Sequence, residues 1–352
     1  MINQQLLYDL EAISSAVGNR PEYVQGGGGN TSVKLDEELM AIKASGFKLR
    51  QVTSHSGFAV VNYNNVKEFL KTASLDSNLD PNIDYENEIT KLINESVVEL
   101  DGLQRLKPSV EVGFHSVLKK YVIHTHSVYA NILCCSKQGS KLTKKIFPES
   151  KWNVIWIPYV NPGFYLALKI FESIETYRKE KGFMPNVFLM ENHGLVVTDD
   201  NKDSCIELHS MINNRIKQYF EINEPYPEII IEKKDNKCFS KTSYLKNFFV
   251  NNKEITNEFF ENIILYPDQL VYLNDSISVN GEENILNINT ENGDLVYNTN
   301  IELAQTIEET LLAYIYVINK IKECGMEVKS MTKQQVDYIR NWESEKYRKR
   351  MV

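Results

Sequence analysis

Two histidines separated by one residue, His124 and His126, stand in the apolar segment 121–128. Side chains two residues apart on a β-strand point to the same face, so this segment would project both imidazoles together. Neutral imidazoles are common ligands of a borderline metal such as zinc. Taken alone, the pair is equally consistent with two surface histidines on a polar strand face.

A third histidine, His193, follows the apolar segment 187–190 and precedes Gly194. We expect Gly194 to let the backbone turn tightly behind the histidine, although an ordinary turn at a strand end has the same composition. Three histidine ligands leave one coordination position of zinc open, which is typical of catalytic rather than structural metal sites.

A glutamate, Glu111, ends the sequence Lys-Pro-Ser-Val-Glu, thirteen residues before His124. Pro108 suits the first turn of a helix, which would place Glu111 in that turn and His115 one turn later on the same face. A helix followed by a strand would therefore bring Glu111 to the histidines. The commoner situation for such a glutamate is a solvated helix start.

Two glycine-containing loops complete the set of candidates. The first is Gly-Gly-Gly-Gly-Asn-Thr at residues 26–31, and the second is Lys-Ala-Ser-Gly at residues 43–46. Such loops expose backbone N–H groups that can hold an anion, and amide and hydroxyl side chains add donors. Lys43 and Lys107 would contribute positive charge. Four consecutive glycines are as often a flexible connector.

The segments that must position these residues alternate between helix and strand patterns. Apolar residues three or four apart predict helices, and short apolar runs bounded by turn residues predict strands. The expected helices are 2–17, 84–100, 110–118, 164–182 and 203–222, and the expected strands are 31–35, 40–43, 58–63, 121–128, 154–160 and 186–197. This irregular alternation predicts a layered α/β sheet.

The pattern changes after residue 225. Segments 266–273, 276–279, 285–290 and 295–298 predict short strands, and residues 301–323 and 332–349 predict two final helices. We therefore divide the chain into a catalytic domain, 1–225, and a C-terminal α+β extension, 226–352. We interpret Leu311, Trp342 and Tyr347 as packing residues and assign no chemistry to the extension.

The overall composition narrows the classes of function. The 352 residues are 42% apolar and 24% charged, which is typical of a soluble globular protein. A net charge of −8 argues against a general nucleic-acid binder. No apolar run is long enough to span a bilayer, and the five cysteines form no CxxC pair. We expect a cytoplasmic protein with neither nucleic acid nor membrane as a partner.

The candidate motifs occur in a definite order: a glycine loop with Asn30, the Ser45-Gly46 loop, Pro-Ser-x-Glu, His-x-His and His-Gly. In this order the chain resembles the class II aldolase/adducin family over roughly residues 5–225. The phrases GGGGNTSVK, IKASG, KPSVE, HTHS, IPYVNPG and ENHGLVV are most similar to long-form sugar-phosphate aldolases, such as the aldolase half of bifunctional rhamnulose-phosphate aldolase/dehydrogenases. The resemblance implies a three-layer α/β/α sandwich around a mixed, largely antiparallel sheet.

The resemblance also implies roles for individual residues. His124, His126 and His193 match the ligands of a divalent metal, with zinc as the expected ion. Glu111 matches the catalytic acid and base. The residues that match the phosphate-binding loops are Gly29, Asn30, Thr31, Ser45, Gly46 and Ser109, with Lys43 and Lys107 as further candidates.

Two departures from the family pattern concern the substrate. Val110 stands where the fuculose-phosphate enzyme has a second serine, so one phosphate donor is missing, and Lys107 is the residue that would compensate. The family's short aldolases also use a tyrosine from a neighbouring subunit, and the corresponding region near Lys145 and Phe147 has none. We therefore assign no proton donor to the departing aldehyde.

The expected activity is that of an aldehyde-lyase that cleaves or forms a carbon–carbon bond in a phosphorylated ketose. A metal held by the histidines would stabilise the enediolate, and Glu111 would move the proton. An epimerase, a dehydratase or a decarboxylase acting on a sugar phosphate would use the same site. A non-catalytic, adducin-like interaction module is the alternative of a different class. The resemblance implies a homo-oligomer, with a tetramer expected.

Overall fold

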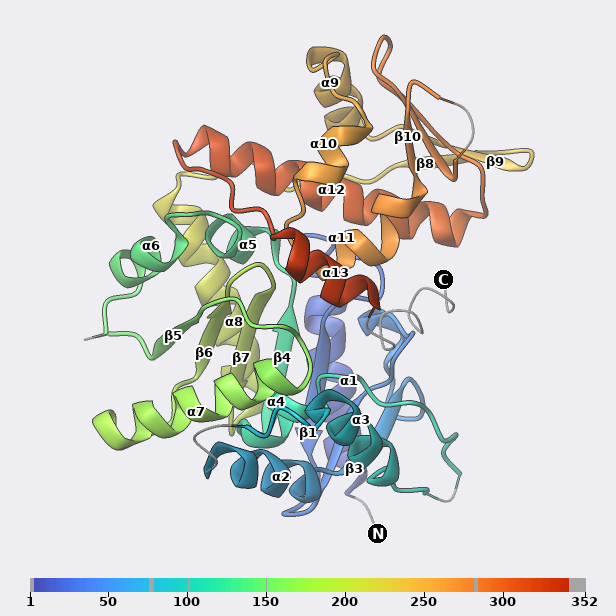
Figure 1. Ribbon diagram of the computed structural model, residues 1–352. Helices are drawn as coiled ribbons and strands as arrows, with labels where there is room; N and C mark the ends of the chain where they lie inside the picture. Colours follow the sequence, from blue (N-terminus) through green and yellow to red (C-terminus); the bar gives the residue numbers. More distant parts are fainter. Residues whose placement is uncertain (1–2, 76–78, 101, 150, 282–283, 342–352) are drawn as a thin grey trace.

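The computed structural model describes residues 3–75, 79–100, 102–149, 151–281 and 284–341 (Figure 1). The larger of its two sheets has seven strands in the order β3-β2-β1-β4-β7-β6-β5. All neighbouring pairs are antiparallel except β5 and β6, which run parallel. The strands are β1 (Asn30–Lys34), β2 (Leu39–Lys43), β3 (Phe58–Asn62), β4 (Tyr121–Thr125), β5 (Val154–Ile157), β6 (Val187–Met190) and β7 (Gly194–Asp199).

Helices cover both faces of this sheet, and two apolar cores separate the three layers. Because side chains alternate along a strand, Ile123 and Val197 enter one core while Val122 and Val196 enter the other. The first core lies under α1 (Gln4–Gly18), α5 (Val128–Cys134), α6 (Gly139–Ile146) and α8 (Lys202–Tyr219). The second lies under α2 (Tyr63–Leu75), α3 (Tyr85–Glu95), α4 (Val112–Val117) and α7 (Phe164–Lys181). This α/β/α arrangement around a mixed, largely antiparallel sheet confirms the predicted fold class.

The C-terminal part contains the smaller sheet, in the order β10-β11-β12-β9-β8. Its strands are β8 (Ile231–Lys234), β9 (Lys237–Ser240), β10 (Ile277–Val279), β11 (Leu286–Asn289) and β12 (Asp294–Tyr297). The remaining helices are α9 (Ser243–Asn251), α10 (Asn257–Asn262), α11 (Pro267–Tyr272), α12 (Ile301–Glu323) and α13 (Lys333–Asn341), with short 3₁₀ turns η1 (Leu49–Gln51) and η2 (Asn274–Ser276).

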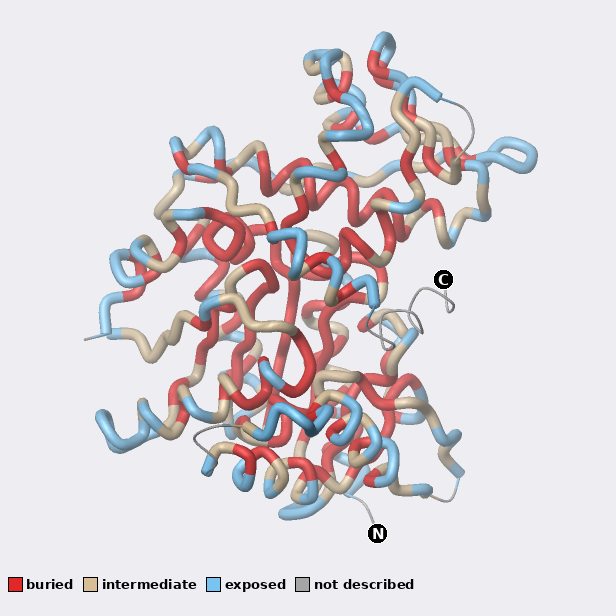
Figure 2. Tube along the Cα trace, in the orientation of Figure 1, coloured by how far each residue is buried: buried red, intermediate tan, exposed pale blue. Residues whose placement is uncertain are grey.

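The long helix α12 joins the two parts of the chain. It contacts α5, which covers the larger sheet, and also α11, β8 and β9 of the C-terminal part (Figure 1). Most of its residues are buried (Figure 2), as expected for a helix whose residues 311–318 are all apolar. Leu311 lies within it and is fully buried, which confirms its role in packing. The domain boundary at residue 225 stays a prediction.

Several expected elements differ from those observed. Segment 266–273 was expected as a strand, and this is wrong: it forms the helix α11, with Pro267 in its first turn, where a proline is well tolerated. Segment 186–197 is two antiparallel strands rather than one. The helix expected over 84–100 ends at Glu95, because Val97 forms a bridge with Val61 of β3. The helices α2, α5, α6, α9 and α10 were not predicted.

The last expected helix, 332–349, is described only as α13. Trp342 and Tyr347, which we interpreted as packing residues, lie outside the described residues. All five cysteines are free thiols, and four of them are buried. Within the described ranges, every helix falls short of the length or the apolar character needed to cross a bilayer.

Candidate active site

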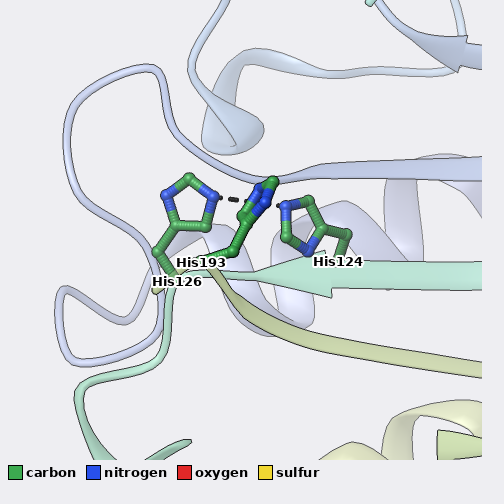
Figure 3. A group of neighbouring side chains, drawn as sticks. All are labelled: His124, His126 and His193. Carbon is green, nitrogen blue, oxygen red and sulfur yellow. Dashed lines mark hydrogen bonds between the residues drawn. The ribbon is translucent and has the colours of Figure 1, made fainter. Parts of the chain in front are cut away.

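The three candidate ligand histidines converge at one end of the larger sheet. His124 is on β4, His126 is the first residue after that strand, and His193 lies in the turn between β6 and β7 (Figure 3). All three side chains are buried. Nε2 of His126 is 3.2 Å from Nε2 of His124, and one ring nitrogen from each residue lies within 4.8 Å of the others.

The sheet brings these residues together because β4 and β7 are neighbours. His124 is opposite Val196 and Thr125 is opposite Leu195, so the turn that precedes β7 ends beside His126. The left-handed residue of this turn is Asn192, with a φ of 50°, and not Gly194 as we expected. Gly194 is needed for a different reason: a Cβ there would lie 2.4 Å from the carbonyl oxygen of Thr125.

In His124 and His126, the ring nitrogen Nδ1 has a hydrogen-bond acceptor. Nδ1 of His124 lies 3.0 Å from the carbonyl oxygen of Leu195, and Nδ1 of His126 lies 2.5 Å from a carboxylate oxygen of Asp268. A carbonyl only accepts, so the His124 proton is on Nδ1, and a carboxylate favours the same tautomer of His126. In their neutral forms, both rings then direct an Nε2 lone pair toward the other ring.

Two lone pairs that face each other at 3.2 Å cannot form a hydrogen bond, but they can share a cation. Zinc–nitrogen bonds are about 2.0–2.1 Å long, so two ligands of a tetrahedral zinc have nitrogens about 3.3 Å apart. The observed separation of the His124 and His126 nitrogens, 3.2 Å, fits this geometry. The chemistry and spacing of the three histidines therefore suit a divalent metal.

The carboxylate of Glu111 faces the same point. Its Oε1 lies 3.1 Å from Nε2 of His193, and its Oε2 lies 3.5 Å from Nε2 of His124. Glu111 is the residue immediately before α4, close to the predicted position in the first helical turn. Burial raises its pKa, but the neighbouring histidines outweigh this effect and hold the pKa well below its usual value. The group is therefore a carboxylate at neutral pH.

A buried hydrogen-bond chain orients Glu111 from behind. Burial lowers the pKa of His115 to about 3, so its ring is neutral. Its Nδ1 pairs with Ser32 Oγ at 2.7 Å, and its Nε2 pairs with Oδ1 of Asn30. The amide nitrogen of Asn30 then donates to Glu111 and, at 3.0 Å, to Ser109 Oγ. His115 thus fixes which end of the Asn30 amide faces the carboxylate.

Most of the expected phosphate-binding residues line a single pocket beside these groups. Its lining includes both glycine loops, Glu111 and two of the histidines, with Pro162 and Pro267 at its wall. From the phosphate set it contains Gly29, Asn30, Ser45, Gly46, Ser109 and Lys43. The buried ammonium of Lys43 donates to the carbonyl oxygens of Gly27 and Phe47, so it joins the two loops while placing positive charge at the pocket.

Two members of the expected set lie elsewhere. Thr31 is next to Asn30 on β1, so its side chain points to the opposite face of the sheet, where Oγ1 lies 2.6 Å from Ser14 Oγ. Lys107 is not among the residues that line the pocket. Its carbonyl oxygen accepts the N–H of Ser45 at 2.9 Å. That amide, which we expected to face an anion, is therefore already engaged.

The sequence interpretation missed the contribution of the C-terminal part. Asp268 and Pro267 of α11 reach the site, and Glu309 of α12 accepts the N–H of Gly26 at 2.8 Å. The available signal was the dipeptide Pro267-Asp268. A proline argues against a central strand, and an acidic residue is unusual inside an apolar segment.

The chain is similar to a known protein family, to a bacterial protein and to several solved structures. The family described as Class II Aldolase and Adducin N-terminal domain matches residues 10–220. A Bacillus subtilis (strain 168) protein named uncharacterized oxidoreductase YuxG is 26% identical over 223 residues. That match covers 58% of this chain and only 29% of the relative, so the chain spans less than a third of that protein's length.

Solved structures resemble the chain over a similar region. The N-terminal class II aldolase domain of a conserved Thermoplasma acidophilum protein is 24% identical, with a TM-score of 0.48, over 60% of this chain and 92% of that one. An L-fuculose 1-phosphate aldolase is 20% identical, with a TM-score of 0.41, over 64% of this chain and 91% of that one. The family match extends over residues 10–220, which is more than half of this chain. The chain therefore belongs to the class II aldolase/adducin family.

Proposed function

We propose that this chain is a divalent-metal-dependent aldolase, with zinc as the expected ion, that cleaves or forms a carbon–carbon bond in a phosphorylated ketose. The observation that carries the proposal is the convergence of three histidines on the carboxylate of Glu111 in one pocket. Family membership supports an aldolase-like activity.

The side chains of the site would have distinct roles in this reaction. His124, His126 and His193 would hold the ion, which supplies a Lewis acid that polarises the substrate ketone. In the synthetic direction Glu111 would remove the proton from the substrate carbon that becomes nucleophilic; in cleavage it would first take up a proton as a carboxylate and then deliver one to that carbon. Its low pKa keeps it in the form that accepts a proton.

The other end of the pocket is suited to an anion. Ser45 and Ser109 provide hydroxyl groups, and Lys43 provides the charge. Binding a phosphate there would fix the reacting carbons beside Glu111, using interactions remote from the bond that breaks. A metal-storage or sensor protein would have no use for this second half of the pocket. The buried chain from His115 through Asn30 to Glu111 likewise has no evident purpose in a pure interaction module.

A cleavage screen tests the proposal. The zinc-loaded protein is incubated with a set of ketose 1-phosphates, and dihydroxyacetone phosphate is measured by a coupled, NADH-dependent reduction. Metal-free protein and Glu111→Gln are the controls. We expect release from at least one substrate by the zinc form alone.

The other outcomes separate the alternatives. An epimerised, dehydrated or decarboxylated product without dihydroxyacetone phosphate would replace the aldolase by one of the related sugar-phosphate enzymes. Absence of any product from the zinc-loaded protein across the set would refute an enzyme of this substrate class.

A further inference from the structure

Asp268 is a buried carboxylate that reaches the histidine cluster from outside the family's matched region. It lies in α11, beyond residue 220 where the family match ends. Its side chain is fully buried, and Oδ2 lies 2.5 Å from Nδ1 of His126. The two residues are 142 positions apart in the chain, so the contact exists only because the C-terminal part packs onto the larger sheet.

The contact determines what the other nitrogen of the ring can do. A carboxylate beside Nδ1 holds the ring proton there, which leaves Nε2 with a free lone pair facing Nε2 of His124. Hydrogen bonds of this kind orient a metal-ligating imidazole and increase its basicity. We propose that Asp268 is a positioning residue for the metal site: it sets the tautomer and ring orientation of His126, so that metal affinity depends on the C-terminal extension. This inference rests on the proposed function.

The glycine loop is shaped to admit this carboxylate. A Cβ on Gly28 would lie 2.1 Å from Oδ2 of Asp268 and 2.9 Å from Nδ1 of His126. The same loop donates the N–H of Gly26 to Glu309 of α12. Gly28 is therefore required by the approach of Asp268, which is a different role from the anion cradle that the glycine run first indicated.

The start of α11 is also fixed to the turn that carries His193. The side chain of Asn192 donates to the carbonyl oxygen of Leu265 at 2.8 Å. The side chain of Gln269 accepts from the N–H of Leu265 at 2.8 Å and donates to the carbonyl oxygen of Ile263 at 2.9 Å. These bonds fix the segment that leads into α11. They also supply a control, because the Gln269 side chain bonds to Leu265 and Ile263, and within the described residues it forms no hydrogen bond with a histidine.

The competing explanation is that Asp268 only anchors the extension. Three full-length proteins distinguish the two: wild type, Asp268→Asn and Gln269→Ala. The dissociation constant for Zn²⁺ is measured by competition with a chromophoric chelator. The visible spectrum of the Co²⁺ form reports ligand geometry, and thermal unfolding of the metal-free protein reports the packing of the extension.

For Asp268→Asn we expect a dissociation constant at least about tenfold higher than wild type, the usual size of such outer-ligand effects, with an altered Co²⁺ spectrum. Gln269→Ala should lower the unfolding temperature and leave the dissociation constant within about threefold. Equal metal affinity in Asp268→Asn and wild type would overturn the inference, as would equal losses in both variants. If the wild-type protein binds no zinc, the proposed function itself fails, and this inference fails with it.

Discussion

Truncating Asn30 should impair the chemical step, whereas truncating Ser45 should impair only the binding of a phosphate. Both residues line the pocket, and the sequence gives them the same expected role. The structure separates them, because the Asn30 amide is already hydrogen-bonded to Glu111, Ser109 and His115. Ser45 is a partly exposed pocket residue with no such link to the carboxylate in the described structure.

The magnitudes follow from the bonds that each change removes. Asn30→Ala deletes a hydrogen bond to the ionised Glu111, worth about 1.5–3 kcal/mol. It also leaves the buried Nε2–H of His115 without its acceptor, at a cost to stability of about 1–3 kcal/mol. If the first loss falls on the transition state, kcat drops by about ten- to a hundredfold. Ser45→Ala removes one neutral donor to a charged phosphate, so KM should rise by a similar factor with kcat preserved.

The assay compares a ketose phosphate that is active in the cleavage screen with its unphosphorylated counterpart, at equal metal content. Asn30→Ala should lower kcat for both substrates, and Ser45→Ala should raise KM only for the phosphorylated one. An unchanged kcat in Asn30→Ala would refute the view that this amide orients Glu111. Equal effects of Ser45→Ala on both substrates would refute the anion site and widen the substrate class to neutral sugars or carboxylates.

Four further outcomes are expected. Glu111→Gln should retain zinc by elemental analysis yet lower kcat by about a hundredfold or more; unchanged turnover would remove Glu111 from the mechanism. Gly28→Ala should displace Asp268 and weaken zinc binding by about tenfold in chelator competition; wild-type affinity would show that the loop yields easily. The folded-state pKa values of His115 and His209 are lowered to about 3, so the unfolded chain binds more protons between about pH 3 and 6.5 and stability should fall as pH decreases through that range. Thermal melts of metal-free protein measure this, and a flat profile would contradict it. Light scattering should show a homo-oligomer, with a tetramer expected, and a fully active monomer would contradict that assembly.

The parts of the site that follow local periodicity could be predicted from the sequence. His124 and His126 are two residues apart, so any strand through them places both rings on one side. Glu111 precedes a short helix that leads directly into that strand. The helix expected over 301–323 is observed over the same residues, because apolar residues recur along its length and include the unbroken run 311–318.

The expectations that differ from the structure are of two kinds. Some concern contacts between segments far apart in the chain, and one concerns the alternation of side chains along a strand. Thr31 was grouped with Asn30, although neighbouring strand residues face opposite sides of a sheet. The amide of Ser45 is expected to face an anion, but it donates to the carbonyl oxygen of Lys107, 62 residues later in the chain. Asp268 has its partner 142 residues away, and no periodicity within its own segment specifies that partner.

The need for Asp268 can be understood from where each histidine lies relative to the sheet. His124 is inside the β4–β7 ladder, and the carbonyl oxygen that holds its Nδ1 belongs to Leu195 of β7. The register that pairs the strands therefore also orients this ring. His126 lies one residue beyond the last paired position, Thr125, so the β4–β7 pairing of the described strands does not supply its Nδ1 with an equivalent acceptor. The acceptor comes instead from α11. One candidate ligand is thus oriented by the larger sheet and another by the C-terminal extension, so the metal site that we propose requires the docking of that extension.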